Sequence, residues 1–247
     1  MAGEQIAELE TTVINQMSVD FIFYHIEKCG GSSLRISLFD YFSKLYTRDE
    51  IFIPDRSCEM DFVRQHLQAI CKQYDCSKLK VILSHMSANY PYKSLNIPAK
   101  MKFTCVRNPV DRVISHYYYF DYPVTQIHMI DMDQSVFDQY VAKMGKIQCD
   151  RMGCLDEYGF PTIANIKKQI QSFYFICIIE QLSDDIKQLN EMLNAEYKCE
   201  HVIGEYTVNV GDAEIKNHSE LKTKISNIPT YDILLYNEVL AHRNAKK

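Results

Sequence analysis

The stretch FIFYHIEKCGGSSLRISLFDYF, residues 21–42, decides the fold, because it sets a glycine-rich turn between an apolar strand and an amphipathic helix. Gly30 and Gly31 let the backbone adopt positive φ and approach a ligand closely. The helix that follows offers free N–H groups and the positive end of its dipole, which together suit a phosphate-like anion. The turn therefore predicts an anion site, and a plain tight turn remains the alternative.

Lys28 adds a mobile positive charge to this turn, and Ser32 and Ser33 add hydroxyl groups. A P-loop kinase or ATPase carries its lysine after the glycines, in the pattern G-x-x-x-x-G-K-[ST]. Here the lysine precedes them, so a nucleotide would be held by a different arrangement.

The rest of the chain predicts an α/β fold. Apolar, strand-like runs occur at residues 20–26, 80–84, 101–106 and 173–179, with segments of helical period between and after them. Short strands that alternate with longer helices favour a central parallel β-sheet flanked by helices. We expect a single domain over residues 1–247, with residues 1–18 peripheral or flexible. From about residue 217 the pattern predicts two helices, broken at Ile228 and Pro229.

Composition excludes several function classes. With 47% hydrophobic and 24% charged residues, the chain has the composition of a soluble globular protein. Its apolar runs are far shorter than the roughly 20 residues that span a bilayer, and its acidic start is unlike a signal peptide, so we expect no membrane association. The net charge of -5 argues against nucleic-acid binding. Nine scattered cysteines without zinc-site spacing are expected to be buried or idle thiols, with no metal.

A second strand-to-helix junction lies in MKFTCVRNPVDRVISHYYYF, residues 101–120. Asn108 and Pro109 are typical of an N-cap and a first helical position. Arg107 therefore stands at the mouth of a helix, where a guanidinium can bind phosphate oxygens with two hydrogen bonds. Two such junctions in one sheet suit a ligand with two separate anionic groups.

The spacing of Arg112, Ser115 and Tyr119 predicts that all three lie on one face of this second helix. Ordinary surface charge is the alternative for the arginines, although it explains poorly why both junctions are built alike.

These two stretches together resemble the PAPS-dependent sulfotransferases, and in pattern the heparan sulfate 2-O- and 6-O-sulfotransferase group most of all. HIEKCGGSSL (25–34) is similar to that group's H-I-P-K-T-G-G-T-S-L loop, and RNPVDRVISHYYYF (107–120) to its R-D-P-x-x-R-x-x-S-x-Y-Y-Y element. FYFICIIEQLSDDIKQLNEML (173–193) and TYDILLYNEVL (230–240) resemble the group's later F-x-F-V-G-x-x-E-x-F-x-x-S-L and D-x-x-L-Y segments. The likeness covers most of the chain in the same order, and it implies a P-loop-like sulfotransferase fold.

The resemblance also implies a donor, 3′-phosphoadenylyl sulfate (PAPS), a product, PAP, and no metal. Lys28 would contact the sulfate and the bridging oxygen and stabilise the leaving phosphate. Arg107 and Ser115 would hold the 3′-phosphate. The residues of the loop that would hold the 5′-phosphosulfate are Lys28, Cys29, Gly30, Gly31, Ser32 and Ser33.

Four positions depart from the family pattern: Glu27 replaces proline, Cys29 and Ser32 occupy threonine positions, and Asn108 replaces aspartate. Glu27 is the least compatible with an anion site. We expect its side chain to point away from the sulfate.

Transfer to an alcohol needs a base, and histidine suits neutral pH. His85 follows the strand-like VILS, and SHMSANYPY resembles the family's G-H-x-x-Y segment, whose histidine is the assigned base. More distant sulfotransferases use a glutamate eight positions after the loop lysine, where this chain has Ile36. His85 is therefore the predicted catalytic base. His25 is expected to be structural, and His116 to face away from Ser115 on its helix.

The predicted acceptor is a hydroxyl of a small molecule or natural product that is neutral or cationic, because residues 121–140 contain four aspartates and no lysine or arginine. A solvent-facing acidic segment is the alternative reading. The aromatic residues Tyr90, Tyr92 and 117–120 could line such a site or belong to the core. A carbohydrate acceptor, and a non-catalytic PAP-binding protein, stay open, as does a homo-oligomer. We expect a cytoplasmic, bacterial enzyme.

Overall fold

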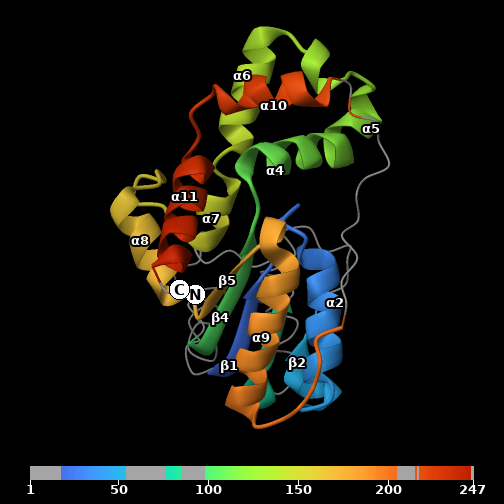
Figure 1. The fold of residues 1–247 in the computed structure, drawn as a ribbon, viewed down its shortest axis with the longest axis vertical. Helices are drawn as coiled ribbons and strands as arrows, with labels where there is room; N and C mark the ends of the chain where they lie inside the picture. The colour runs from blue at the N-terminus through green and yellow to red at the C-terminus, as the bar shows by residue number, and fades with distance from the viewer. Residues whose placement is uncertain (1–17, 54–75, 85–97, 205–214, 216, 246–247) are drawn as a thin grey trace, which may run out of the picture.

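The computed structural model describes residues 18–53, 76–84, 98–204, 215 and 217–245. Five parallel strands form one central sheet in the order β2-β3-β1-β4-β5 (Figure 1). They are β1 (Val19–Tyr24), β2 (Ile51–Phe52), β3 (Val81–Ser84), β4 (Ala99–Val106) and β5 (Phe175–Ile178). The predicted α/β class and parallel sheet are confirmed.

The four strands predicted from apolar runs are all present, within two residues at each end. They read as continuous apolar runs because helices cover both faces of a parallel sheet; every residue of β3 and of β5 is buried. The sequence missed β2, since two residues are too short to show a period. Residues 1–17 lie outside the described part of the chain, so the expectation for the N-terminal segment stays a prediction.

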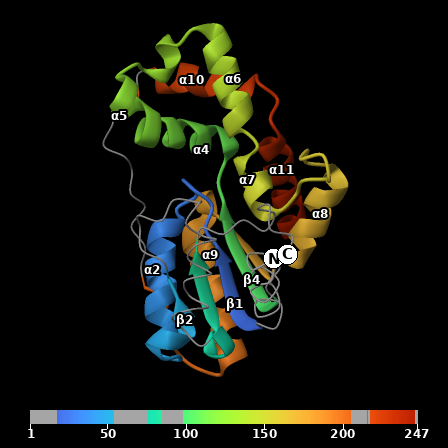
Figure 2. The same ribbon diagram turned by 180° about the vertical axis from the view of Figure 1, so that it is seen from behind.

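Two long helices, α2 (Gly31–Phe42) and α9 (Leu182–Tyr197), pack side by side against the sheet (Figure 1). The Tyr41 hydroxyl donates to Asn194 Oδ1 at 2.8 Å, and the rings of Phe42 and Tyr197 lie 5.7 Å apart. Beside β4 and β5 lies a second group of helices (Figures 1 and 2), which comprises α7 (Ile147–Met152), α8 (Ile163–Ser172) and α11 (Tyr231–Asn244).

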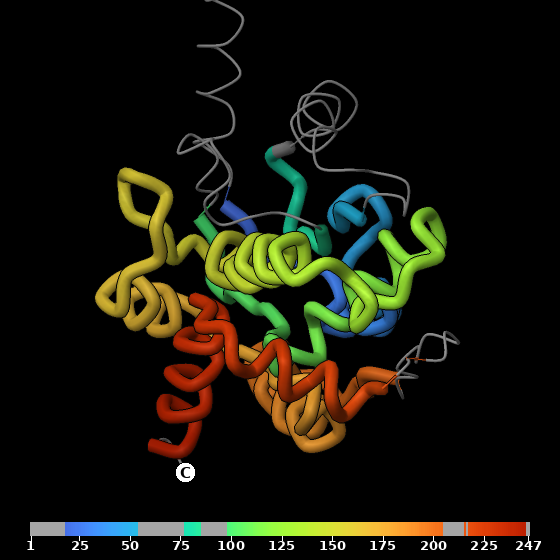
Figure 3. The backbone as a smooth tube through the Cα atoms, turned by 90° about the horizontal axis from the view of Figure 1, so that it is seen from above, coloured from blue at the N-terminus to red at the C-terminus, as the bar shows by residue number. Residues whose placement is uncertain are grey.

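A helical layer lies over the carboxyl edge of the sheet and has its own hydrophobic cluster (Figures 1 and 3). The layer comprises α4 (Pro109–His116), the π-helix η4 (Tyr117–Asp121), α5 (Tyr122–Thr125), α6 (Gln134–Met144) and α10 (His218–Ser226). The predicted pair of C-terminal helices is confirmed as α10 and α11. Short 3₁₀ helices complete the described part: η1 (Arg48–Glu50), η2 (Cys76–Lys78), η5 (Met129–Asp131) and η6 (Ile179–Gln181).

The strand order places a topological switch at β1. The chain runs from β1 through β2 to β3 on one side of the sheet, and β4 and β5 follow on the other. In open parallel sheets, ligands bind beyond the carboxyl ends of the strands at such a point. The loops after β1 and β4 therefore border the expected ligand site.

Six cysteines of the described residues are free thiols. Cys199 is half-buried, and the others are buried: Cys29, Cys105, Cys149, Cys154 and Cys177.

Candidate functional site

The two strand-to-helix junctions lie next to each other. β1 and β4 are neighbours in register, with Tyr24 opposite Thr104, so their following loops leave the same edge side by side. Arg107 Nη1 donates a hydrogen bond to the backbone carbonyl of Lys28 at 3.2 Å. Because this contact joins the two loops directly, the positive groups of both junctions belong to one site.

The β1–α2 loop has the backbone of an anion cradle. Lys28 and Gly30 both lie in the left-handed region, with φ of 62° and 70°. Alternation of right- and left-handed residues turns successive N–H groups towards a common centre. Gly30 is the N-cap of α2, and it makes no side-chain hydrogen bond to this helix start. The first-turn N–H groups and the helix dipole suit an incoming anion.

Gly31 is required by packing rather than by its φ. A Cβ at this position would lie 1.9 Å from Cδ2 of His25, whose ring is buried and stacks on Phe23. His25 therefore has the structural role predicted for it, since its ring fills the space beneath the loop.

Gly31→Ala is expected to lower the free energy of unfolding by about 1–3 kcal/mol, because the buried ring must move to admit a methyl group. Gly204→Ala is the matched control, since a Cβ there meets nothing within 4 Å, and it should change stability by less than about 0.5 kcal/mol. Urea unfolding of both variants makes the comparison; equal stabilities would contradict the packing role of Gly31.

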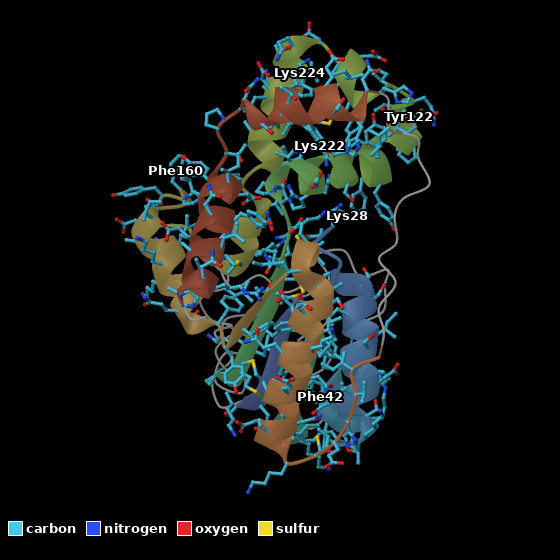
Figure 4. All side chains as sticks on the ribbon, in the orientation of Figure 1. Lys28, Phe42, Tyr122, Phe160, Lys222 and Lys224 are labelled. Atoms are coloured by element: carbon cyan, nitrogen blue, oxygen red, sulfur yellow. The ribbon has the colours of Figure 1, made fainter. Side chains whose placement is uncertain are left out.

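The Lys28 side chain leaves the loop towards the helical layer and lies beneath α4 (Figure 4). Its Nζ stands 3.7 Å from the centre of the Tyr119 ring, in a cation–π contact. Burial, and secondly the neighbouring Arg107, lower the pKa of Lys28 below its ordinary value. Lys28 is thus partly desolvated and repelled by a second cation, so an anion bound between the two would relieve both costs.

The Gln148 side chain contacts both junctions, at Arg107 and at Cys29. Its Oε1 accepts the N–H of Arg107 at 2.9 Å and lies 3.5 Å from the Cys29 sulfur, while its Nε2 donates to the Arg107 carbonyl at 3.0 Å. Cys29 is fully buried, and its N–H is directed to the carbonyl of Ile26. The role of Cys29 in the loop is therefore that of an interior anchor.

Gln148 is held in turn by a buried carboxylate. Asp232, in the first turn of α11, accepts the N–H groups of Gln148 and Cys149 at 3.0 and 2.9 Å and lies 3.8 Å from Arg112 Nε. Asp232 and Arg112 are both fully buried. Burial raises the pKa of Asp232, and Arg112 opposes this shift.

The burial of Arg112 corrects one expectation. The sequence places Arg112, Ser115 and Tyr119 on one helix face, but Arg112 also donates to the Met144 carbonyl inside the protein, whereas the Tyr119 side chain is 61% exposed. The cause is η4, because the wider turns of a π-helix rotate Tyr119 away from the α-helical register.

The start of α4 is built as predicted. Asn108 Oδ1 accepts the N–H groups of Val110 and Asp111 at 3.0 and 3.4 Å, and Pro109 occupies the first turn. The Asn108 N–H donates to Glu180 Oε1 at 2.8 Å, which joins this junction to the end of β5.

Glu27 does not face the anion cradle. Arg151 Nε and Nη2 bind its two carboxylate oxygens at 3.1 and 2.7 Å. The Arg151 side chain is only 7% exposed, so the ion pair is largely shielded from water. This pairing agrees with the expectation that Glu27 points away from a bound sulfate, which stays a prediction.

The remaining predicted site residues are placed as follows. Ser32 is exposed and Ser33 half-buried in the first turn of α2. Ser115 is half-buried in α4, about 9 Å along the helix axis from Pro109, and no direct contact joins it to Lys28 or Arg107 within the described residues. His85, Tyr90 and Tyr92 lie outside the described residues.

Within the described ranges, no cluster of three or more His, Cys, Asp or Glu side chains could hold a metal ion. A search of the same ranges finds no helix with the length and apolarity to cross a bilayer. No family model matches the chain, and no curated protein matches it.

Proposed function

We propose that this protein is a PAPS-dependent O-sulfotransferase with a P-loop-like sulfotransferase fold. The observation that carries the proposal is the contact between Arg107 and the Lys28 carbonyl, since it brings two positively charged helix mouths to one point of the sheet edge. A ligand with two anionic groups on one adenosine fits that arrangement. The resemblance of both loops to sulfotransferase motifs supports PAPS as this ligand.

The donor would span the two junctions. The 5′-phosphosulfate would bind the backbone of residues 28–33 with the hydroxyls of Ser32 and Ser33, while Arg107 and Ser115 would bind the 3′-phosphate. Cys29 would act through the loop backbone, because its thiol is buried against Gln148. PAP would remain as the product, and no metal takes part in the proposal.

Transfer would be in line. The oxygen of the acceptor hydroxyl forms a bond to sulfur as the bond from sulfur to the bridging phosphate oxygen breaks, and PAP leaves with the electron pair. The Lys28 ammonium would stabilise the negative charge on that leaving oxygen. His85 is the proposed base that takes the hydroxyl proton; in the sequence it comes directly after Ser84, the last residue of β3.

The proposed acceptor is the hydroxyl of a neutral or cationic small molecule. Of the acidic residues in 121–140, Asp133 caps α6 and Asp138 accepts from Gln134, so these two have local structural roles. Of the four aspartates, Asp121 is the one that follows Tyr119 and Phe120 directly in the chain. A carbohydrate acceptor is the second candidate, and it would require basic residues that segment 121–140 lacks.

Arg107→Ala is expected to weaken PAP binding by about 2 kcal/mol, or roughly 30-fold, because a charge-assisted pair with the 3′-phosphate is lost. The affinity for AMP, which has no 3′-phosphate, should change far less. Titration calorimetry of both ligands measures this difference. Arg48→Ala, an exposed arginine on η1, is the control and should leave both affinities unchanged.

Two results would contradict the proposal. A wild-type protein with no preference for PAP over AMP has no 3′-phosphate site. A protein that binds PAP tightly but transfers no label from ³⁵S-PAPS to any small-molecule or glycan acceptor is a non-catalytic binding protein.

A further inference from the structure

Three polar side chains form a chain of hydrogen bonds in the helical layer. The Tyr140 hydroxyl, on α6, donates to Asp121 Oδ2 at 2.7 Å, and His116 Nδ1, at the end of α4, lies 3.0 Å from the same hydroxyl. Asp121 Oδ2 is also 3.7 Å from His116 Nδ1. The sequence did not group these residues, and the proposed donor site uses none of them.

This arrangement fixes the state of the imidazole. A tyrosine hydroxyl has one hydrogen, and that of Tyr140 is committed to the Asp121 carboxylate. The Tyr140 oxygen can therefore only accept from His116, which places the ring hydrogen on Nδ1. In a neutral imidazole the other nitrogen, Nε2, then carries a lone pair that can accept a hydrogen bond.

The groups around His116 keep this neutral form stable. Burial, and next the Arg112 guanidinium, lower its pKa, and Lys28 acts in the same direction. Asp121 and Glu27 oppose this shift. Burial raises the pKa of Tyr140, and its hydrogen bond to Asp121 adds to the rise, so the hydroxyl stays protonated near neutral pH.

A row of ring contacts connects His116 to the Lys28 ammonium. The Lys28 ammonium sits on the Tyr119 ring, the Tyr119 and Phe120 rings meet edge to face at 4.7 Å, and the Phe120 ring lies 4.8 Å from the His116 ring. Tyr119 and Phe120 are 61% and 48% exposed. Both belong to η4, and π-helical turns are rare and concentrate at functional sites. The sequence expectation that His116 faces away from Ser115 stays a prediction, and the contact of His116 with Phe120 was not predicted.

We propose that His116 Nε2, with the exposed rings of Tyr119 and Phe120, binds the acceptor: the nitrogen accepts a hydrogen bond from it, and the rings stack on its apolar face. The acceptor class is a ring-bearing alcohol without negative charge, since the Asp121 carboxylate disfavours an anion at this position. The inference rests on the proposed function and deepens it. His85 keeps the role of base, and His116 is a specificity-determining residue.

A matched pair of variants separates this role from a structural one. In His116→Asn, the side-chain amide can take the place of Nδ1 and keep the Tyr140 hydrogen bond, but nothing replaces Nε2. In His116→Gln, the amide reaches the position of Nε2 and loses the Tyr140 bond. We expect His116→Asn to raise the KM for the acceptor at least 10-fold. His116→Gln should raise this KM less, and kcat should change less than 3-fold in both variants.

The experiment measures transfer from ³⁵S-PAPS to 4-ethylphenol and to tyramine, which differ in one positive charge, and to N-acetylheparosan as the glycan. His85→Ala, measured in parallel, should lower kcat and remove the acidic limb of its pH profile while leaving KM nearly unchanged. PAP affinity by calorimetry should stay at the wild-type value in both His116 variants.

Four outcomes would overturn the inference while leaving the sulfotransferase activity itself intact. The first two are a normal KM for the acceptor in His116→Asn and a larger rise of that KM in His116→Gln than in His116→Asn. The third is loss of the acidic pH limb in His116→Asn rather than in His85→Ala. The fourth is transfer to the glycan but to neither phenol. If the wild-type protein transfers sulfate to no acceptor, the proposed function itself has failed.

Discussion

Lys28→Ala is expected to lower kcat by about 10²- to 10³-fold, because it removes a charge that acts mainly in the transition state. As the bond from sulfur to the bridging oxygen breaks, negative charge grows on the leaving phosphate beside the Lys28 ammonium. Lys28 is partly buried, and this burial lowers its pKa. Because the surroundings are less polar than water, its charge interacts with the leaving oxygen more strongly than that of a solvated lysine would. The measurement is single-turnover transfer from ³⁵S-PAPS.

Lys44→Ala, an exposed lysine just beyond α2, is the control and should keep full activity. Lys28→Arg keeps the charge, so it should lose less than Lys28→Ala. Only the protonated form of Lys28 stabilises the leaving oxygen. Because the pKa of Lys28 is lowered, wild-type activity should fall with rising pH already below about 10.4, the ordinary pKa of lysine. A Lys28→Ala variant with kcat within about threefold of wild type would exclude this role.

Asp232→Ala is expected to lower the free energy of unfolding by about 3–5 kcal/mol, the cost typical of removing one partner of a buried ion pair. The substitution strands the guanidinium of the fully buried Arg112 and leaves the N–H groups of Gln148 and Cys149 without their acceptor. Since Gln148 holds Arg107, PAP affinity should fall as well. Guanidinium unfolding and PAP calorimetry measure the two effects.

Asp184→Ala, at a side chain 89% exposed on α9, is the matched control and should change stability by less than about 0.5 kcal/mol. Asp232→Asn should fall between the two, because its amide oxygen still accepts one N–H group while the charge opposite Arg112 is gone. Loss of stability in Asp232→Ala with unchanged PAP affinity would show that the link from α11 to the donor site is absent.

Much of the architecture could be predicted because it depends on local pattern. The strands around β1, β3, β4 and β5 are continuous apolar runs, and such runs are what a sheet covered on both faces requires. The cap at Asn108 and Pro109 was predicted equally well, since capping depends on residues adjacent in the chain. Gly30 has the positive φ that was predicted for it, whereas Gly31 does not, and the positive φ of Lys28 was not predicted.

The contacts that shape the candidate site were not predictable in this way. Gln148 joins residues 41 and 119 positions away, and nothing in the local pattern of a short polar helix indicates either partner. Asp232 is recognisable from the sequence as an acidic residue in the first turn of a helix. No local pattern indicated that Arg112 is buried beside it. The contacts of His116 with Tyr140 and Phe120 were not predicted, since Tyr140 lies 24 positions away on another helix and Phe120 belongs to a π-helical turn.

The sequence by itself determined the α/β class, the two strand-to-helix junctions and the residue types that could hold an anion there, because these depend on hydrophobic period, glycine and helix caps. The tertiary structure alone decided that the two junctions touch through Arg107 and Lys28, that Arg112 is interior, and that His116 stands beside Tyr119 and Phe120. The physical reason is that side chains far apart in the chain meet only when strand order and helix packing bring them together, and no local propensity encodes that meeting.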